Sequence, residues 1–302
     1  CCYHGWTFDV DGTILSTLLS RQGVEVIGLT KPGLGTGLLT QYVPDVQLIE
    51  CDLADLDGLR DTVQAVQPEQ VYNLGAFTAP GESWEHVEEV QRINVDAVGA
   101  LLDGLRHNAK AGRPGRLFQA SSSHIYEGTD RSPQTEAFEL TPHSPYAKSK
   151  AQALTLVRQA REQDGIFAVS GIMYNHESPL RTDNFVTRRV TKAVARIAAG
   201  QQDILELGDI EVARDWGWAP DYVRAMMLML ATETPQDYVL ATGISHRLSF
   251  FITKAFAAVG ITDWQDLVVS TSDRTRPVDT NKMVGDSRRA YLELGWRHPV
   301  DF

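Results

Sequence analysis

Residues 116–126 read RLFQASSSHIY, a short apolar run that ends in three serines and a histidine. This short apolar run and its flanking turn residues predict a buried strand over 116–122. Other short runs of this kind predict strands at 24–29, 46–50, 70–76 and 166–174. The segments between them predict helices at 12–22, 55–66, 85–108 and 145–163. This alternation predicts the α/β class, with a doubly wound parallel sheet that binds ligands at the carboxyl ends of its strands.

The pattern changes after about residue 175, where short strands in DILELG (203–208) and DYVLATG (237–243) separate longer helical segments. Those segments predict helices near 185–200, 219–231 and 248–259. The second contains AMMLMLATE, an apolar run typical of a buried helix. We therefore divide the chain into a first domain of residues 1–174 and a smaller α/β domain of residues 175–302, with residues 1–10 atypical of the first.

Composition excludes several classes of function. The chain has 302 residues, 28 Lys and Arg against 39 Asp and Glu, and a net charge of −11, which argues against general nucleic-acid binding. No run of 18 apolar residues predicts a membrane span, and the start lacks the features of a signal peptide. Its three cysteines cannot form a disulfide framework, so we expect a reducing, cytoplasmic location.

The clearest chemical pattern joins ASSSHIY (120–126) to SPYAKSK (144–150). Tyr146 and Lys150 are four residues apart and share one face of the expected helix. A lysine there lowers the pKa of the phenol by placing a positive charge beside the phenolate. Ser122, at the end of a neighbouring strand, can polarise the same substrate oxygen. These groups suit proton transfer at an alcohol or carbonyl while a nicotinamide exchanges a hydride.

A family resemblance follows from these motifs and from several others between Asp11 and Phe302. They include DGTIL (11–15), CDLAD (51–55), YNHESP (174–179), FVTRRVTKA (185–193) and RDWGWAPDYV (214–223). With them the chain resembles the extended short-chain dehydrogenase/reductases, and within these the GDP-mannose 4,6-dehydratase family. The resemblance implies a Rossmann-like dinucleotide-binding domain over 1–174 and a mainly substrate-binding domain over 175–302.

The resemblance also implies chemistry and partners. Family members use NADP to oxidise the mannose at C4, eliminate water across C5 and C6, and reduce C6. Ser122, Tyr146 and Lys150 match the catalytic positions, and GDP-mannose or a related sugar nucleotide is the expected substrate. The implied cofactor contacts are Gly12, Lys31, Asp52, Leu53, Leu74 and Ala76, together with Tyr146 and Lys150. The implied substrate contacts are Ser83, Asn175, Arg189, Arg214 and Arg276. A homo-oligomer, dimer or tetramer, is also implied, and no metal is expected.

One departure from the family falls at His124. The family carries a glutamate here, and that glutamate is the base of the elimination step. An imidazole with an ordinary pKa near ~6.5 can also take a proton at neutral pH. A structural histidine is the alternative, and the remaining Ser, Tyr and Lys would then suit a sugar-nucleotide reductase or epimerase.

A second departure lies at the start. The family has a Gly-x-x-Gly-x-x-Gly turn that receives the cofactor pyrophosphate. If Gly12 is its last glycine, Trp6 and Asp9 occupy the other two positions, and cofactor binding should suffer. Lys31 is the expected partner of the NADP 2′-phosphate. The glycine-rich KPGLGTG (31–37) follows a strand, and no helix is expected after it, so we interpret it as a surface loop.

The first residues, CCYHGWTFDVDG (1–12), resemble the second half of a Rieske iron–sulfur motif. A Rieske centre needs two Cys and two His, and the first half of the motif is missing. A zinc site at Cys1, Cys2 and His4 would lack an evident fourth ligand. We expect a joined gene sequence here and a fragment at both ends of the chain. A non-catalytic protein that binds GDP-sugars is therefore a further functional alternative.

Overall fold

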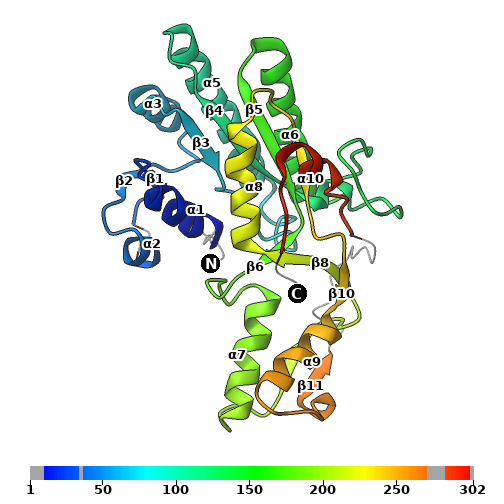
Figure 1. The fold of residues 1–302 in the computed structure, drawn as a ribbon. Helices are drawn as coiled ribbons and strands as arrows, with labels where there is room; N and C mark the ends of the chain where they lie inside the picture. Colours follow the sequence, from blue (N-terminus) through cyan, green and yellow to red (C-terminus); the bar gives the residue numbers. More distant parts are fainter. Residues whose placement is uncertain (1–9, 34–36, 271–282, 300–302) are drawn as a thin grey trace.

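The computed structural model describes residues 10–33, 37–270 and 283–299. At its centre, β3 (Gln70–Asn73), β4 (Arg116–Ser122), β5 (Phe167–Met173) and β9 (Tyr238–Leu240) form a parallel sheet in the order β3-β4-β5-β9 (Figure 1). β4 and β5 pair over seven residues each and are buried along almost their whole length. This near-continuous burial is what a parallel sheet with both faces covered requires.

Two further strands lie beside this sheet without joining it. β1 (Ile27–Thr30) and β2 (Gln47–Glu50) pair in parallel as a separate two-stranded sheet. Among the described residues, no ladder joins β1 to β3. In the classic doubly wound order, the position between them belongs to the strand that precedes the first helix. Residues 1–9, which precede that helix here, lie outside the described residues.

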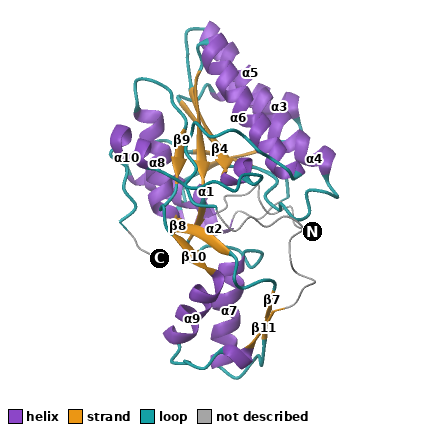
Figure 2. Cartoon of the chain, turned by 90° about the vertical axis from the view of Figure 1, so that its right-hand side faces the viewer, coloured by secondary structure: helices purple, strands orange, loops and turns teal. Residues whose placement is uncertain are grey.

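Helices cover both faces of the sheet, as the alternating pattern predicts (Figure 2). On one face α3 (Leu56–Val66), α5 (Ala97–Lys110) and α6 (Pro145–Asp164) enclose an aliphatic core. On the other face α8 (Ala219–Ala231) packs between α1 (Val10–Arg21) and α10 (Arg288–Leu294). Met226 and Met229 of α8 are buried in this second core, and Met227 is partly buried against it, which confirms the buried helix expected over 219–231.

The helix expected over 85–108 is divided in the structure. α4 (Val87–Gln91) passes into a π-helical turn over Arg92–Asp96 and continues as α5. The side chain of Asn94, in this turn, accepts a hydrogen bond from the Phe77 amide and donates to Ser149. The buried carboxamide gains these partners where the helix widens. The turn thereby fastens α6 to the loop after β3.

The second body lies below the first in Figures 1 and 2. Its sheet has the order β10-β8-β6, formed by β6 (Asn175–Glu177), β8 (Ala213–Trp218) and β10 (Ser245–Arg247). β7 (Leu205–Leu207) pairs with β11 (Val268–Ser270), and α7 (Val186–Ala198) packs with α9 (Leu248–Ala258). The chain does not stay in this body after residue 175. α8, β9 and α10 return to the first body.

One sequence expectation is wrong. We expected no helix after the glycine-rich residues 31–37, but α2 (Gly37–Tyr42) begins at the last of these glycines. Leu39 and Val43 are both buried there, and tertiary burial outweighs the poor helix propensity of glycine. Among the helices of the described residues, none is long and apolar enough to cross a membrane.

Candidate active site

The site begins at the carboxyl end of β4. Ser122 is the last residue of this strand and lies beside Met173 of β5. The chain then turns through a short 3-10 helix, η2 (Ser123–Tyr126), and the Ser122 hydroxyl accepts a hydrogen bond from the His124 amide at 3.3 Å. One side chain therefore ends the strand and caps the turn, which holds Ser122 and His124 together at the ligand-binding edge of the sheet.

α6 brings the tyrosine and lysine to the same edge. Ser144 caps this helix by accepting the Ala147 amide, and Pro145 occupies its first turn. Tyr146 and Lys150 follow one turn apart, with only 7% and 4% of their surfaces exposed. The Lys150 Nζ lies 5.8 Å from the centre of the Tyr146 ring, so the shared face that we predicted is present.

Lys150 is held against the strand and retains unused donors. Its Nζ donates to the Ala120 carbonyl oxygen at 3.0 Å, two residues before Ser122. An ammonium carries three N–H donors, and among the described residues the structure gives no other hydrogen bond to it. Burial lowers the pKa of Lys150 to about 8. The two remaining donors face no acceptor in the described protein, and ribose hydroxyls would satisfy them, so the residues here fit a nicotinamide cofactor.

His124 lies within this cluster. Its ring meets the Tyr146 ring edge-on, with 5.5 Å between the centroids and 84° between the planes. Its Nδ1 is 3.1 Å from Oε2 of Glu127, and 28% of its side chain is exposed. The imidazole therefore borders the tyrosine without being enclosed. A base that acts on the same substrate as Tyr146 should lie beside it with part of its ring exposed, as His124 does.

Sequence reasoning missed Glu127. Burial alone would raise the pKa of this carboxyl, but hydrogen bonds from His124 and from the Ser144 and His143 amides lower it to about 2. Glu127 therefore stays ionised at neutral pH. A signal was present in the sequence: an acidic residue three positions after a histidine on a helical turn faces it.

Three of the predicted cofactor contacts line a cavity of about 750 Å³ between β1 and β3. Gly12 from the first turn of α1 lines it, as do Leu53 after β2 and Leu74 after β3. Ala76 is buried just beyond Leu74. The cavity occupies the interruption between the two parallel sheets. The cofactor side of the fold is thus less closely packed than the β4–α6 side.

Lys31 and Asp52, which were assigned to the cofactor separately, form a pair. The Lys31 Nζ lies 3.7 Å from Asp52 Oδ2, and about a third of each side chain is exposed. Asp52 also accepts a hydrogen bond from the Ala54 amide at 2.9 Å. A phosphate at this position would compete with Asp52 for the lysine. Trp6 and Asp9 of the altered glycine turn lie outside the described residues.

The substrate contacts implied for the second body are spread over three elements. Asn175 begins β6 and is in register with Trp216 of β8. Arg214, also on β8, donates to the Ala213 carbonyl oxygen at 2.8 Å. Arg189 is exposed on α7. Asn175 and Arg214 thus sit on directly paired strands, and Arg189 on the neighbouring helix.

The last two implied substrate contacts have different outcomes. Ser83 is fully buried, and its hydroxyl donates to the Pro80 carbonyl oxygen at 2.7 Å, which closes a local turn. Arg276 lies outside the described residues. Among the residues that are described, no group of three His, Cys, Asp or Glu side chains is arranged to hold a metal ion. Cys1, Cys2 and His4 also fall outside that part of the chain.

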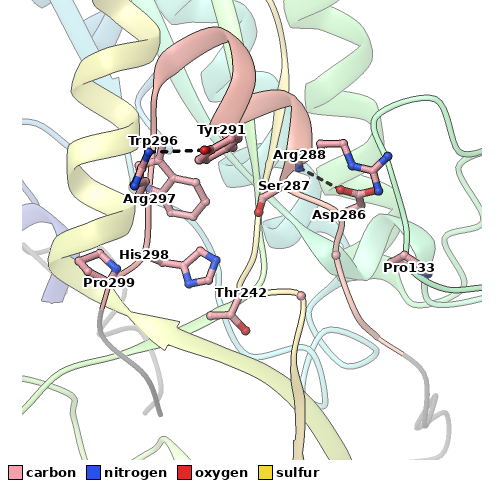
Figure 3. A pocket seen from close by; sticks show the side chains of 12 residues that line it. Pro133, Thr242, Asp286, Ser287, Arg288, Tyr291, Trp296, Arg297, His298 and Pro299 are labelled. Atoms are coloured by element: carbon pink, nitrogen blue, oxygen red, sulfur yellow. Dashed lines mark hydrogen bonds and ion pairs between the residues drawn. The ribbon is translucent and has the colours of Figure 1, made fainter.

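A second hollow, of about 690 Å³, lies between the turn after β9 and the residues that flank α10 (Figure 3). Among the described residues that line it, none is a predicted site residue. Two of its cationic side chains already have partners: Arg288 lies 3.5 Å from Asp286, and Arg297 donates to the Tyr291 hydroxyl at 3.4 Å. We therefore place the candidate active site at the β4–α6 edge.

Comparison with solved structures shows the fold class. The crystal structure of the dTDP-glucose 4,6-dehydratase DesIV from Streptomyces venezuelae, with NAD and TYD bound, matches with a TM-score of 0.84. The match covers 99% of this chain and 91% of that one, at 22% sequence identity. This likeness shows that the two chains share one α/β fold over nearly their whole lengths.

The sequence comparisons define the family within that class. The profile of the family described as GDP-mannose 4,6 dehydratase matches residues 10–302. GDP-mannose 4,6 dehydratase 1 of Arabidopsis thaliana is 38% identical, covering 97% of this chain and 83% of the relative. The GDP-mannose 4,6-dehydratase of Sinorhizobium fredii is 36% identical, covering 95% and 89%. The chain belongs to the GDP-mannose 4,6-dehydratase family.

Proposed function

We propose that the protein converts GDP-mannose to GDP-4-keto-6-deoxymannose with loss of water. The observation that carries this proposal is the buried cluster of Ser122, Tyr146 and Lys150 at one strand end, with His124 against the tyrosine. Family membership supplies the reaction, and the cluster supplies groups able to perform it.

At C4 of the mannose, Tyr146 removes the hydroxyl proton and Ser122 donates a hydrogen bond to the same oxygen. Lys150 lies beside the ring of Tyr146, and its charge favours the phenolate. A bound nicotinamide supplies the acceptor for the C4 hydride and later the donor to C6. Lys150 has the spare donors to hold the ribose of that cofactor in place.

The elimination needs a base near C5. Oxidation at C4 makes the neighbouring C5 proton acidic, and a neutral imidazole at His124 can take it. The edge-on contact of His124 with Tyr146 keeps the two proton acceptors on one side of the sugar. A structural histidine would need no exposed ring beside the tyrosine, so the open position of His124 supports the role of base.

We further propose NADP as the cofactor, in a cytoplasmic homo-oligomer. Lys31, at the end of β1, supports a 2′-phosphate contact, although Asp52 competes for its charge. The scarcity of cysteine supports a reducing compartment. Light scattering of the purified protein would test the oligomer, and binding measurements with NADP and NAD would test the cofactor.

A second candidate function is binding of a GDP-sugar without turnover. The sequence of the glycine turn favours it, because Trp6 and Asp9 stand where the family carries glycines that receive the cofactor pyrophosphate. In this case GDP would bind while the nicotinamide cofactor would not.

The deciding experiment incubates the protein with GDP-mannose and NADP and follows the sugar nucleotide by mass spectrometry. Loss of one water from the substrate, abolished in Tyr146→Phe, is the expected result. Conversion without a change in mass would instead indicate an epimerase. No conversion with retained GDP binding and no cofactor binding would favour the second candidate.

A further inference from the structure

Glu127, which contacts His124, has no assigned role in the proposed reaction. Glu127 is 5% exposed and lies on the same short turn as His124, three residues later. Its Oε2 is 3.1 Å from His124 Nδ1 and 3.3 Å from the Ser144 hydroxyl. Glu127 is thus a buried carboxylate in contact with the imidazole that borders Tyr146. Such a contact influences which nitrogen of the imidazole carries the proton.

The position of Glu127 is fixed by the start of the catalytic helix. Its Oε1 accepts hydrogen bonds from the His143 amide, at 2.8 Å, and from the Ser144 amide. Ser144 is the residue that caps α6, two positions before Tyr146. The carboxylate therefore ties the turn that carries His124 to the helix that carries the tyrosine, and the two cannot shift independently.

The backbone around Glu127 is closely packed as well. The Gly128 amide donates to the Thr141 carbonyl oxygen, and the Thr141 amide donates to the Ile125 carbonyl oxygen. A Cβ at residue 128 would come within 2.6 Å of His143 Nε2 and 2.7 Å of the Thr141 carbonyl oxygen. Only glycine allows this approach of the two segments. The direction of the Glu127 side chain is thus set by packing on both sides.

An ionised carboxylate can only accept hydrogen bonds, so the proton of the neutral imidazole must lie on Nδ1. The lone pair then lies on Nε2. Among the described residues, the structure gives Nε2 no hydrogen-bond partner. His124 thus combines a fixed tautomer, an unpaired basic nitrogen and a ring edge-on to Tyr146. This is the arrangement in which a carboxylate orients a histidine base.

We propose that Glu127 is a positioning residue that makes His124 the base of the elimination, so that a histidine–glutamate pair replaces the single carboxylate of the family. The inference rests on the proposed dehydratase function. Nε2 takes the C5 proton, and the electrons of the C5–H bond form the C5–C6 double bond. The C6–O bond breaks, and the same proton passes from Nε2 to the departing oxygen. Water leaves, His124 returns to neutrality, and Glu127 stays ionised throughout.

Glu127→Gln is the sharpest test, because it keeps the shape of the side chain. The amide oxygen can still accept the His143 and Ser144 amides, while the NH₂ group faces Nδ1 and forces the imidazole proton onto Nε2. We expect kcat for water loss to fall about 100-fold or more, with KM for GDP-mannose little changed. Glu127→Asp keeps the charge and should retain more activity than Glu127→Gln.

Glu136→Gln is the matched control. Glu136 belongs to the same segment, is partly buried and accepts the Val239 amide at 2.8 Å, but it does not contact His124. Its exchange should leave kcat within about twofold. Equal losses in Glu136→Gln and Glu127→Gln would overturn the proposal, since the effect would then belong to any buried carboxylate of the segment.

The tautomer is measured separately, in the free protein, from the ¹⁵N chemical shifts of the His124 ring at a pH where it is neutral. We expect Nδ1–H in the wild type and Nε2–H in Glu127→Gln. Nε2–H in the wild type would overturn the proposal. This measurement needs no substrate, so it decides the role of Glu127 even if GDP-mannose is not converted, which would count against the proposed function alone.

If Glu127→Gln does not fold, the tautomer of the wild type still decides the proposal. If it folds, a pair of double variants tests whether a base acts from position 124. His124→Glu with Glu127→Gln places one carboxylate at the base position, as the family has it, and leaves position 127 uncharged. We expect water loss by this double variant to exceed that of His124→Gln with Glu127→Gln at least tenfold. Equal rates for the two double variants would show that no base acts from position 124 and would contradict the proposal.

Discussion

The two halves of the first body differ in the length of their strands and in how closely these strands are packed. On one side β4, β5 and α6 hold the catalytic groups on seven-residue strands that are buried and in register. On the other side β1 and β2 are four-residue strands in a separate sheet, next to a cavity of about 750 Å³. The first side carries the catalytic groups, including Lys150, which we propose holds the cofactor ribose, and the second carries the other predicted cofactor contacts.

The difference shows that the catalytic groups of the β4–α6 side and the cofactor contacts of the β1–β3 side are held in place by separate packing. The catalytic side is fixed by bonds that do not cross the cavity: Lys150 to Ala120, Asn94 to Ser149, and Glu127 to Ser144. The cofactor side depends on an interface that the described residues leave open. Variants on the two sides should therefore change different measurements.

The largest effect is expected at Tyr146. Tyr146→Phe removes the hydroxyl that exchanges the proton at C4, while the ring still packs, so turnover of GDP-mannose should fall about 1,000-fold. Binding of the cofactor, measured by calorimetry, should change little. Tyr291→Phe, which removes an exposed hydroxyl on α10 that accepts a hydrogen bond from Arg297, is the control and should keep normal turnover. A loss of cofactor binding in Tyr146→Phe would break the separation of the two sides.

Next in size is a pair of leucine truncations. Leu117 is fully buried near the start of β4, and Leu117→Ala should lower the free energy of unfolding by about 4 kcal/mol. Leu29 on β1 is partly buried and already lines the cavity, so Leu29→Ala should cost about 1 kcal/mol. Urea unfolding measures both. Equal losses would mean that the cofactor side is as well packed as the catalytic side.

The buried ammonium of Lys150 gives a pH dependence. Its pKa is about 8 in the fold, against an ordinary value of 10.5, because burial disfavours the charged form. Between these values the unfolded chain holds more protons, so this group makes the protein more stable as pH rises. The penalty is fully present below pH 8 and disappears towards pH 10.5.

Lys150→Met removes this penalty. The free energy of unfolding of the variant minus that of the wild type should therefore be smaller by about 2 kcal/mol at about pH 10 than at about pH 8. Urea unfolding of variant and wild type across this range is the measurement. Lys148→Met, an exposed lysine on the same helix, should show no such change. A constant difference between Lys150→Met and wild type would indicate that Lys150 is hydrated rather than sealed against β4.

The smallest effect belongs to the cofactor side. Lys31→Ala should weaken NADP binding about 10-fold and leave NAD binding unchanged, because only NADP carries the 2′-phosphate. Stability should hardly change, since an exposed pair such as Lys31 and Asp52 contributes little. Unchanged NADP affinity in calorimetry would show that Asp52 keeps the lysine from the cofactor.

Much of the fold could be predicted from local pattern. The strand at 116–122 and the helix at 219–231 have the predicted bounds, because both are long, apolar and flanked by turn residues. The strand expected at 24–29 begins only at Ile27, and α2 was missed, because short segments are decided by tertiary burial. The division at residue 175 likewise could not show that β9 returns to pair with β5.

The sequence by itself determined the types of the proposed catalytic residues and their order along the chain: a serine at a strand end, and a tyrosine and lysine one helical turn apart. These follow from periods of two and 3.6 residues, which need no distant partner. It also determined the family, through motifs read position by position. Only the tertiary structure decided which groups touch.

The proposed role of Glu127 depends on hydrogen bonds from amides sixteen and seventeen residues away and on its contact with His124. Asn94 bridges two segments far apart in the chain, and the interruption between β1 and β3 is visible only in the assembled sheet. Such contacts depend on the global arrangement of the backbone, because burial and hydrogen-bond partners are properties of the packed molecule and not of any local stretch of residues.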